Sequence, residues 1–137
     1  MSKVIDWDKL KIVWESNLKV VAVWVFGSAQ EGLVKPGSDV DIAILFESQP
    51  SLEDQLDLLT QLQKRLQVED IDLVVLNEAN PILCFEAVSG RLLFCRDANR
   101  RAEFVSLVAR EYEDAMALWQ RGLEYRQEMT NKVSDNL

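Results

Sequence analysis

The apolar residues of this chain follow helical spacing in some segments and strand spacing in others. Residues 6–17 carry apolar side chains three or four positions apart, which predicts an amphipathic helix. Residues 20–26 (VVAVWVF) form a continuous, largely β-branched apolar run, typical of a strand buried on both faces. The same two patterns predict further strands at 39–46, 70–76 and 91–95, and further helices from Ser51, over 81–89 and over about 99–129.

The order of these elements predicts a fold of the α/β (α+β) class. Strands that alternate with helices favour a small mixed sheet of about four strands, flanked by helices and followed by a long C-terminal helix. A length of 137 residues is that of one domain. We therefore expect a single domain over 1–137, with a core at 1–98 and a C-terminal helix at 99–130 that packs on the core.

Several apolar residues are expected in the core, and the last helix leaves one alternative open. The leucines between Leu52 and Leu66 are expected to pack as one core-facing stripe. The stripe of the last helix from Val105 to Leu123 is expected to cover the sheet. The four tryptophans and both cysteines are also expected in the core. Four residues off the stripe are either ordinary surface positions or a patch for a partner: Phe104, Leu107, Leu118 and Tyr125.

Composition and charge exclude several classes of function. The chain has no histidine, which excludes Ser-His-Asp and Cys-His catalysis and every zinc site that uses imidazole. Two cysteines cannot form a four-thiolate zinc site. A net charge of −8 disfavours direct binding of nucleic acid, although a small anion can still bind through a divalent cation. The sequence shows neither a membrane-length apolar run nor a signal-peptide pattern, so we expect a cytoplasmic protein.

Pairs of carboxylates occupy the beginnings of two predicted strands. Asp39 and Asp41 share one face of the second strand by its period of two, and Asp70 and Asp72 repeat the arrangement on the third. Like charges this close repel one another, and a divalent cation between them removes the conflict. Carboxylates are hard oxygen donors, which suits Mg²⁺ and also Mn²⁺. Of these four, Asp70 is the one expected to be merely a solvated residue at a strand end.

A glycine and a serine interrupt the chain directly after the first strand. Gly27 and Ser28 begin a predicted short helical turn, followed by a loop up to residue 38. Backbone N–H groups in such a turn favour a phosphate, Gly27 permits close approach, and Ser28 adds a hydroxyl donor. A phosphate site beside paired carboxylates is typical of phosphoryl or nucleotidyl transfer that uses two metal ions.

The spacing of these residues resembles a known family. Gly27-Ser28, ten intervening residues and then Asp39-Val40-Asp41 is similar to the signature of the polymerase-β-type nucleotidyltransferase superfamily. The chain looks like its minimal nucleotidyltransferase branch, the small proteins encoded beside HEPN-domain toxins. Segments 72–76 (DLVVL) and 91–94 (RLLF) strengthen this likeness. The resemblance implies a polymerase-β-like nucleotidyltransferase fold over nearly the whole chain.

The resemblance also assigns roles to residues. It implies that Asp39, Asp41 and Asp72 hold two Mg²⁺ ions and carry the catalysis, while Gly27 and Ser28 bind the phosphates of ATP. We add two residues to the nucleotide-binding set. Ser38 is included with a turn or cap role as its alternative, and Lys35 is the nearest cation, because residues 29–32 lack the Arg or Lys that family members often carry there.

The function implied by the resemblance is that of an antitoxin enzyme. Such a protein transfers AMP from ATP to a tyrosine of a HEPN ribonuclease toxin, forms a hetero-oligomer with that toxin and silences it. Two alternatives remain open at this point. One is an antitoxin that masks its toxin by binding alone, which Glu31 beside the phosphate turn favours. The other is nucleotidyl transfer to a small molecule such as an aminoglycoside, for which 137 residues leave little room.

Overall fold

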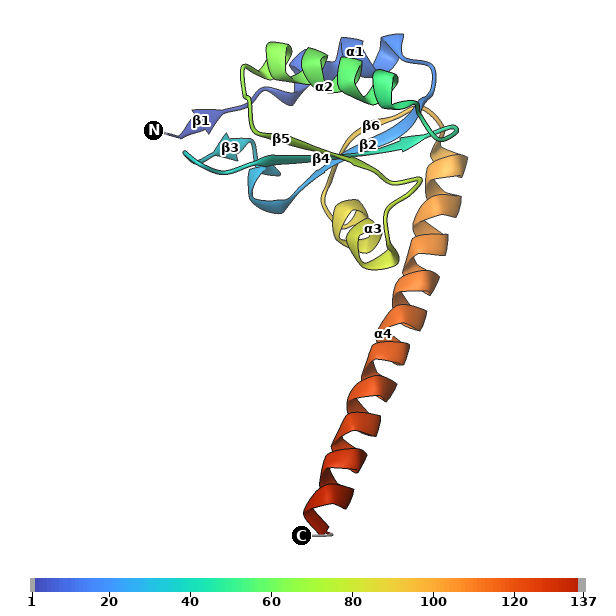
Figure 1. Cartoon of the computed structure of the whole chain (residues 1–137). Helices are drawn as coiled ribbons and strands as arrows, with labels where there is room; N and C mark the ends of the chain where they lie inside the picture. The colour runs from blue at the N-terminus through green and yellow to red at the C-terminus, as the bar shows by residue number, and fades with distance from the viewer. Residues whose placement is uncertain (1, 136–137) are drawn as a thin grey trace.

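A four-stranded mixed sheet forms the centre of the molecule in the computed structural model, which describes residues 2–135 (Figure 1). Its strands are β2 (Val20–Phe26), β4 (Val40–Phe46), β5 (Ile71–Val75) and β6 (Arg91–Cys95). They lie in the order β5-β4-β2-β6, with β4 and β5 parallel and the other pairs antiparallel. The predicted class, the mixed sheet and all four of its strands are therefore confirmed.

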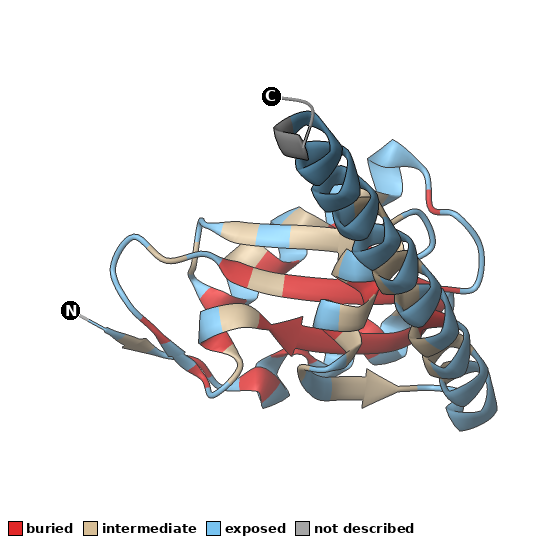
Figure 2. Ribbon diagram, turned by 90° about the horizontal axis from the view of Figure 1, so that it is seen from below, coloured by how far each residue is buried: buried red, intermediate tan, exposed pale blue. Residues whose placement is uncertain are grey.

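The two central strands are buried because helices cover both faces of the sheet. Every residue of β2 is buried, and every residue of β4 except Asp41 is buried as well. The continuous apolar run VVAVWVF is the pattern expected of such a strand. In Figure 2, these two strands are the most continuously buried part of the sheet. Asp41 is thus the one polar residue of β4, and it is half-buried beside the core.

One face of the sheet is covered by the N-terminal helices and α2 (Figure 1). The predicted helix at 6–17 divides into a 3-10 helix, η1 (Trp7–Leu10), and α1 (Lys11–Ser16). The helix predicted from Ser51 is α2 (Leu52–Leu66). Side chains of these helices pack on Val20, Val23 and Val25 of β2, where the register shifts between Val20 and Ala22, and on the even-numbered face of β4.

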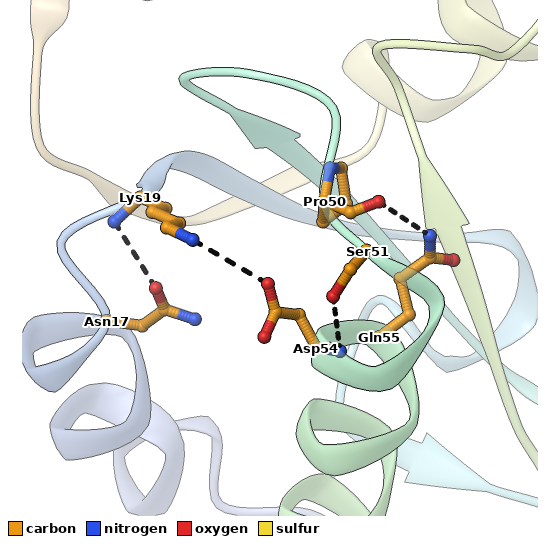
Figure 3. Close-up of polar contacts among 6 residues, drawn as sticks. All are labelled: Asn17, Lys19, Pro50, Ser51, Asp54 and Gln55. Atoms are coloured by element: carbon orange, nitrogen blue, oxygen red, sulfur yellow. Dashed lines mark hydrogen bonds and ion pairs between the residues drawn. The ribbon is translucent and has the colours of Figure 1, made fainter.

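Polar contacts fix the start of α2 against the preceding loop (Figure 3). The Ser51 hydroxyl accepts a hydrogen bond from the Asp54 backbone N–H at 3.0 Å, which is the N-cap that the sequence predicts. The Lys19 ammonium lies 3.7 Å from the Asp54 carboxylate. The Gln55 side chain donates to the Pro50 carbonyl, and the Asn17 side chain accepts from the Lys19 backbone N–H. These contacts tie α2 to the chain that enters β2.

The leucine stripe expected along α2 is only partly correct. Leu58, Leu62 and Leu66 are buried, but Leu52 and Leu56 are exposed. Leu58, Leu62 and Leu66 follow at four-residue spacing and share one side of α2, whereas Leu52 and Leu56 each stand six residues before a buried leucine and so fall on a different side. The leucines therefore do not all belong to one core-facing stripe.

The other face of the sheet is covered by α3 (Pro81–Val88) and by the first turns of α4 (Ala98–Asp135). The Asn80 side chain caps α3 by accepting from the Leu83 backbone N–H at 2.9 Å. Phe85 of α3 stacks on Tyr112 of α4 with ring centroids 3.9 Å apart. Cys84 is buried here as expected, whereas Cys95 is half-buried and both are free thiols.

The predicted C-terminal helix is present, but only its first part packs on the core. Val108 is fully buried, whereas Trp119 is 58% exposed and Leu123 is 37% exposed. The helix continues far beyond the sheet and points away from it (Figures 1 and 2). The expectation that the whole stripe from Val105 to Leu123 covers the sheet is therefore wrong, and so is the core position of Trp119. The sheet is shorter than the apolar stripe of α4, so residues at the end of that stripe have no sheet to cover.

A second, two-stranded sheet was not predicted. β1 (Lys3–Val4) pairs antiparallel with β3 (Leu33–Val34) beside the predicted turn. The turn itself is a single 3-10 turn, η2 (Gly27–Ala29). Strands of two residues carry too little periodicity to be recognised in a sequence. Among residues 2–135, no helix combines the length and the apolar character needed to cross a bilayer.

Candidate active site

The predicted carboxylates meet where β2 ends and where β4 and β5 begin. Asp41 is in register with Phe26, the last residue of β2, and with Asp72 of the parallel strand β5. Register partners project their side chains to the same face of a sheet, which here is the α3 face. Asp39 precedes β4 by one residue. The structure thus brings together the three carboxylates that spacing predicted from separate segments.

Asp70, the fourth carboxylate of the sequence pattern, has a backbone role. Its carbonyl accepts a hydrogen bond from the Val40 backbone N–H at 2.8 Å, which starts the pairing of β4 with β5. The Asp70 residue is exposed, and it is not among the charges that act on Asp41. This matches the expectation of a solvated residue at a strand end.

Asp41 is the acid of this cluster whose pKa is raised by its surroundings. Partial burial raises the pKa of Asp41 above its ordinary value of 3.8, and the negative charges of Asp72, Asp39 and Glu86 raise it further. Crowded carboxylates of this kind are typical of functional sites, where a cation or a proton relieves the repulsion.

Gly27 stands directly against Asp41. Its φ of +73° is a left-handed conformation that favours glycine, and a Cβ built on it would lie 2.5 Å from Asp41 Oδ2. The Gln30 side chain donates to the Gly27 carbonyl at 3.2 Å and so closes the turn. The Asp41 carboxylate thus lies against Gly27, while the close approach of a phosphate to Gly27 stays a prediction. The three-residue turn is too short to contribute the dipole of a long helix.

The remaining predicted residues lie around this turn. Ser28 is exposed directly after Gly27. Lys35 and Ser38 belong to the loop that leads into β4, where the Ser38 backbone N–H donates to the Lys35 carbonyl at 3.1 Å. Lys35 is exposed and Ser38 is half-buried. Ser38 thus takes part in a turn, and its place in a nucleotide site stays a prediction, as does that of Lys35.

Glu86 of α3 is a site residue that sequence reasoning missed. Its charge acts on Asp41 from the helix that packs over the sheet. One signal for it was available, because Glu86 is the only acid in the otherwise apolar segment 81–89 (PILCFEAVS). The sequence also showed no sign of the role of Gln30, whose side chain donates to the Gly27 carbonyl.

The carboxylates of Asp39, Asp41 and Asp72 are ligands of the kind that a hard divalent cation prefers. Carboxylates are oxygen donors of the kind Mg²⁺ and Mn²⁺ take, and the mutual repulsion at Asp41 would fall if a cation bound there. Within residues 2–135, no three ligand-type side chains are already arranged around one point as a metal site. Residues Asp39, Asp41 and Asp72 therefore fit a cation by charge and type.

Comparison with known proteins identifies the class. The family model "Polymerase beta, Nucleotidyltransferase" matches residues 8–99, which is most of the chain and all of the four-stranded sheet. This chain therefore belongs to the polymerase beta nucleotidyltransferase family. The match confirms the polymerase-β-like fold and places the Gly-Ser turn and the three carboxylates inside the shared domain. A search of curated proteins finds no match to the sequence.

Solved structures with the same fold include chains of toxin–antitoxin complexes. A chain of a toxin–antitoxin crystal structure with AMP-PNP is 24% identical, with a TM-score of 0.66, over 94% of this chain and 98% of that chain. A chain of a tri-AMPylated HEPN toxin in complex with MNT antitoxin from Shewanella oneidensis is 22% identical, with a TM-score of 0.57, over 92% and 95%. A putative minimal nucleotidyltransferase is 28% identical, with a TM-score of 0.50, over 64% and 94%.

Proposed function

We propose that this chain is an antitoxin that transfers AMP from ATP to a tyrosine hydroxyl of a HEPN ribonuclease toxin. The observation that carries the proposal is the meeting of Asp39, Asp41 and Asp72 beside the Gly27 turn, within a nucleotidyltransferase domain. Structures of the same fold include a complex with AMP-PNP and a complex with a tri-AMPylated HEPN toxin. These two complexes support ATP as donor and a toxin as acceptor.

The transfer exchanges one phosphorus–oxygen bond for another. The acceptor hydroxyl oxygen forms a bond to the α-phosphorus of ATP, and the bond from that phosphorus to the bridging oxygen breaks. Pyrophosphate leaves, and the hydroxyl proton passes to Asp72 or to solvent beside it. When bound, divalent cations neutralise phosphate charge and lower the pKa of the attacking hydroxyl. Asp39 and Asp41 would hold them, with Asp72 as the third ligand.

The turn after β2 would bind the phosphates of the nucleotide. Gly27 has no side chain, which lets the Asp41 carboxylate lie directly against the turn. Ser28 is exposed and offers its hydroxyl and its backbone N–H as donors. The bond from Gln30 to the Gly27 carbonyl holds the turn in one conformation before the nucleotide arrives. Preorganised donors of this kind favour the transition state over the ground state.

Intact-mass spectrometry of a HEPN toxin from the same source tests the proposal. After incubation with this chain, ATP and Mg²⁺, we expect the toxin to gain one or more AMP units. The gain should disappear when EDTA replaces Mg²⁺. It should also disappear in the D39N/D41N double variant, which keeps the size of both side chains. Transfer that persists in the double variant would contradict the assignment of the site.

An antitoxin that acts by binding alone is the second candidate. The exposed apolar face of α4 favours it, because such a face can mask a toxin without any chemistry. Glu31, exposed beside the phosphate turn, also favours it. The same experiment separates the two functions. A stable complex that suppresses the ribonuclease while the toxin mass stays unchanged would support binding alone.

A further inference from the structure

The distal half of α4 and the outer side of α3 form an apolar groove. A cavity of about 590 Å³ lies between them, lined by Ile82 of α3 and by α4 residues that include Met116, Leu118 and Trp119. Ile82, Leu118 and Trp119 are each more than half exposed. Large apolar side chains gathered around a hollow are typical of a protein-binding surface.

The groove continues toward the candidate active site. A second cavity of about 410 Å³ shares Ile82 and Ala115 with the first, and Glu86 is among its lining residues. Glu86 is also the α3 residue whose charge acts on Asp41. A molecule that lies along the groove therefore reaches Glu86 at one end, beside the carboxylates proposed to carry the chemistry.

The α4 wall of the groove lies outside the domain shared with the family. The family match ends at residue 99, and α4 begins at Ala98. Nucleotide and metal chemistry belongs to the shared domain, whereas an acceptor differs from one family member to another. A helix appended to the shared domain is thus a suitable element to recognise the acceptor.

The charges near the groove favour a basic occupant. Segment 111–128 of α4 carries five acids and two arginines, one of which, Arg126, lines the groove, while Asp39, Asp41, Asp72 and Glu86 lie at the other end. A second copy of this chain would bring these acidic segments together and repel. A segment with an apolar face flanked by Lys or Arg has the complementary charge.

We infer that the α3–α4 groove binds an amphipathic, basic helix of the protein acceptor and so presents the acceptor hydroxyl to the carboxylates at the Glu86 end. The inference rests on the proposed function for the identity of the acceptor. A third helix packs naturally along two others, and the stretch from Ala115 to Arg126 is about 18 Å long, enough for roughly three turns of a helix. Trp119 is the central apolar anchor.

Steady-state AMP transfer to the HEPN toxin tests the inference with the variants W119E and W119A. We expect the KM for the toxin to rise at least tenfold in W119E and less in W119A, with kcat within about twofold of wild type. Calorimetric titration with AMP-PNP should give wild-type affinity. The matched control is L56E, an equally exposed apolar position on α2 across the sheet, which should leave the KM unchanged. An unchanged KM in W119E would overturn the inference.

A photocrosslinker at Ile82 identifies the occupant. Mass mapping should find the crosslink in a helix of the toxin that is apolar on one face and basic on its flanks. Raising the salt from 50 to 500 mM should weaken the complex, because the attraction between charges is screened. A crosslink to a second copy of this chain, or to an acidic segment, would overturn the inference. Circular dichroism of each variant shows whether it is folded.

The proposed function and this inference can fail separately. If wild type transfers no AMP, the proposed function fails, and the groove is then judged by the affinity of the toxin for W119E against L56E. If wild type transfers AMP and W119E does so with the same KM, the proposed function stands and the groove assignment fails.

Discussion

The contact between Gly27 and Asp41 joins the two halves of the sequence motif. The motif glycine is commonly explained by access for the phosphates. Here it has a second reason, because a side chain at position 27 would collide with the Asp41 carboxylate. After the ten residues between Ser28 and Asp39, the chain enters β4. Asp41 of β4 is in register with Phe26, the residue just before Gly27.

Replacing Gly27 by alanine should damage both stability and activity. We expect G27A to lose roughly 1–3 kcal/mol of stability from its positive φ. Displacement of Asp41 should lower kcat about 100-fold, since small misplacements of catalytic groups have effects of that order. The matched control is G37A, with a φ of +79° and nothing within 4 Å of its added Cβ. Thermal unfolding and AMP transfer measure both effects. Equal losses of activity in the two variants would contradict the Asp41 explanation.

The raised pKa of Asp41 predicts a pH dependence of stability. Above pH 3.8 and up to the raised pKa, the folded state holds a proton that the unfolded state has released. Without divalent cations, stability should therefore fall as the pH rises through that window. D41N should lack this loss and unfold at a higher temperature than wild type at pH 7. An increase of about 3 °C corresponds to roughly 1 kcal/mol for a chain of this size.

Thermal melts of wild type and D41N in EDTA, at pH values from 4 to 7, measure this difference. Added Mg²⁺ should raise the melting temperature of wild type more than that of D41N, because the cation removes the same repulsion. A D41N protein that is less stable than wild type across the whole range would contradict the crowding of carboxylates at this position.

At the scale of the elements, α4 is one helix in two environments. Its apolar stripe runs without a break, yet Val108 is fully buried and Val133 is 59% exposed. The stacking of Phe85 on Tyr112 lies near the end of the packed part. The first turns thus stabilise the fold, whereas the distal turns leave their apolar side chains exposed. Helical spacing is identical in both parts and does not distinguish them.

Paired valine variants locate the boundary between these two parts. V108A should cost about 2 kcal/mol, from the lost methyl groups and the cavity they leave. V133A should change the free energy of unfolding by less than ~0.5 kcal/mol. Denaturant unfolding measures both. In hydrogen exchange, amides of α4 before Tyr112 should be better protected than those after Trp119. Equal costs in the two variants would place the distal half in a packed environment.

At the scale of the whole molecule, α4 makes the fold elongated (Figure 1). Its 38 residues span about 57 Å, well beyond the sheet. A compact chain of 137 residues would have a radius of gyration of about 14 Å. Small-angle X-ray scattering of the isolated chain should give a clearly larger value. A value near 14 Å would mean that α4 folds back on the core, which would also close the groove.

Local patterns in the chain predict the elements of this protein and much of its candidate site. Apolar runs predicted the four strands: VVAVWVF is continuous, as burial on both faces requires, whereas the runs at 39–46 and 70–76 begin with carboxylates at alternate positions. Two carboxylates at a spacing of two predicted one cluster, because the pleat puts them on one face. The spacing of Gly27-Ser28 before Asp39 predicted the family. All of these features are local in the chain, and local geometry fixes them.

Only the tertiary structure decided which elements meet and where the core ends. Glu86 joins the carboxylates because α3 packs over the end of the sheet, and Gly27 touches Asp41 because β2 pairs with β4 in one register. Trp119 has the spacing of a core residue but lies past the sheet and stays exposed. A helix face is fixed by the sequence around it. Its burial depends on the size of the surface opposite, which only the assembled sheet provides.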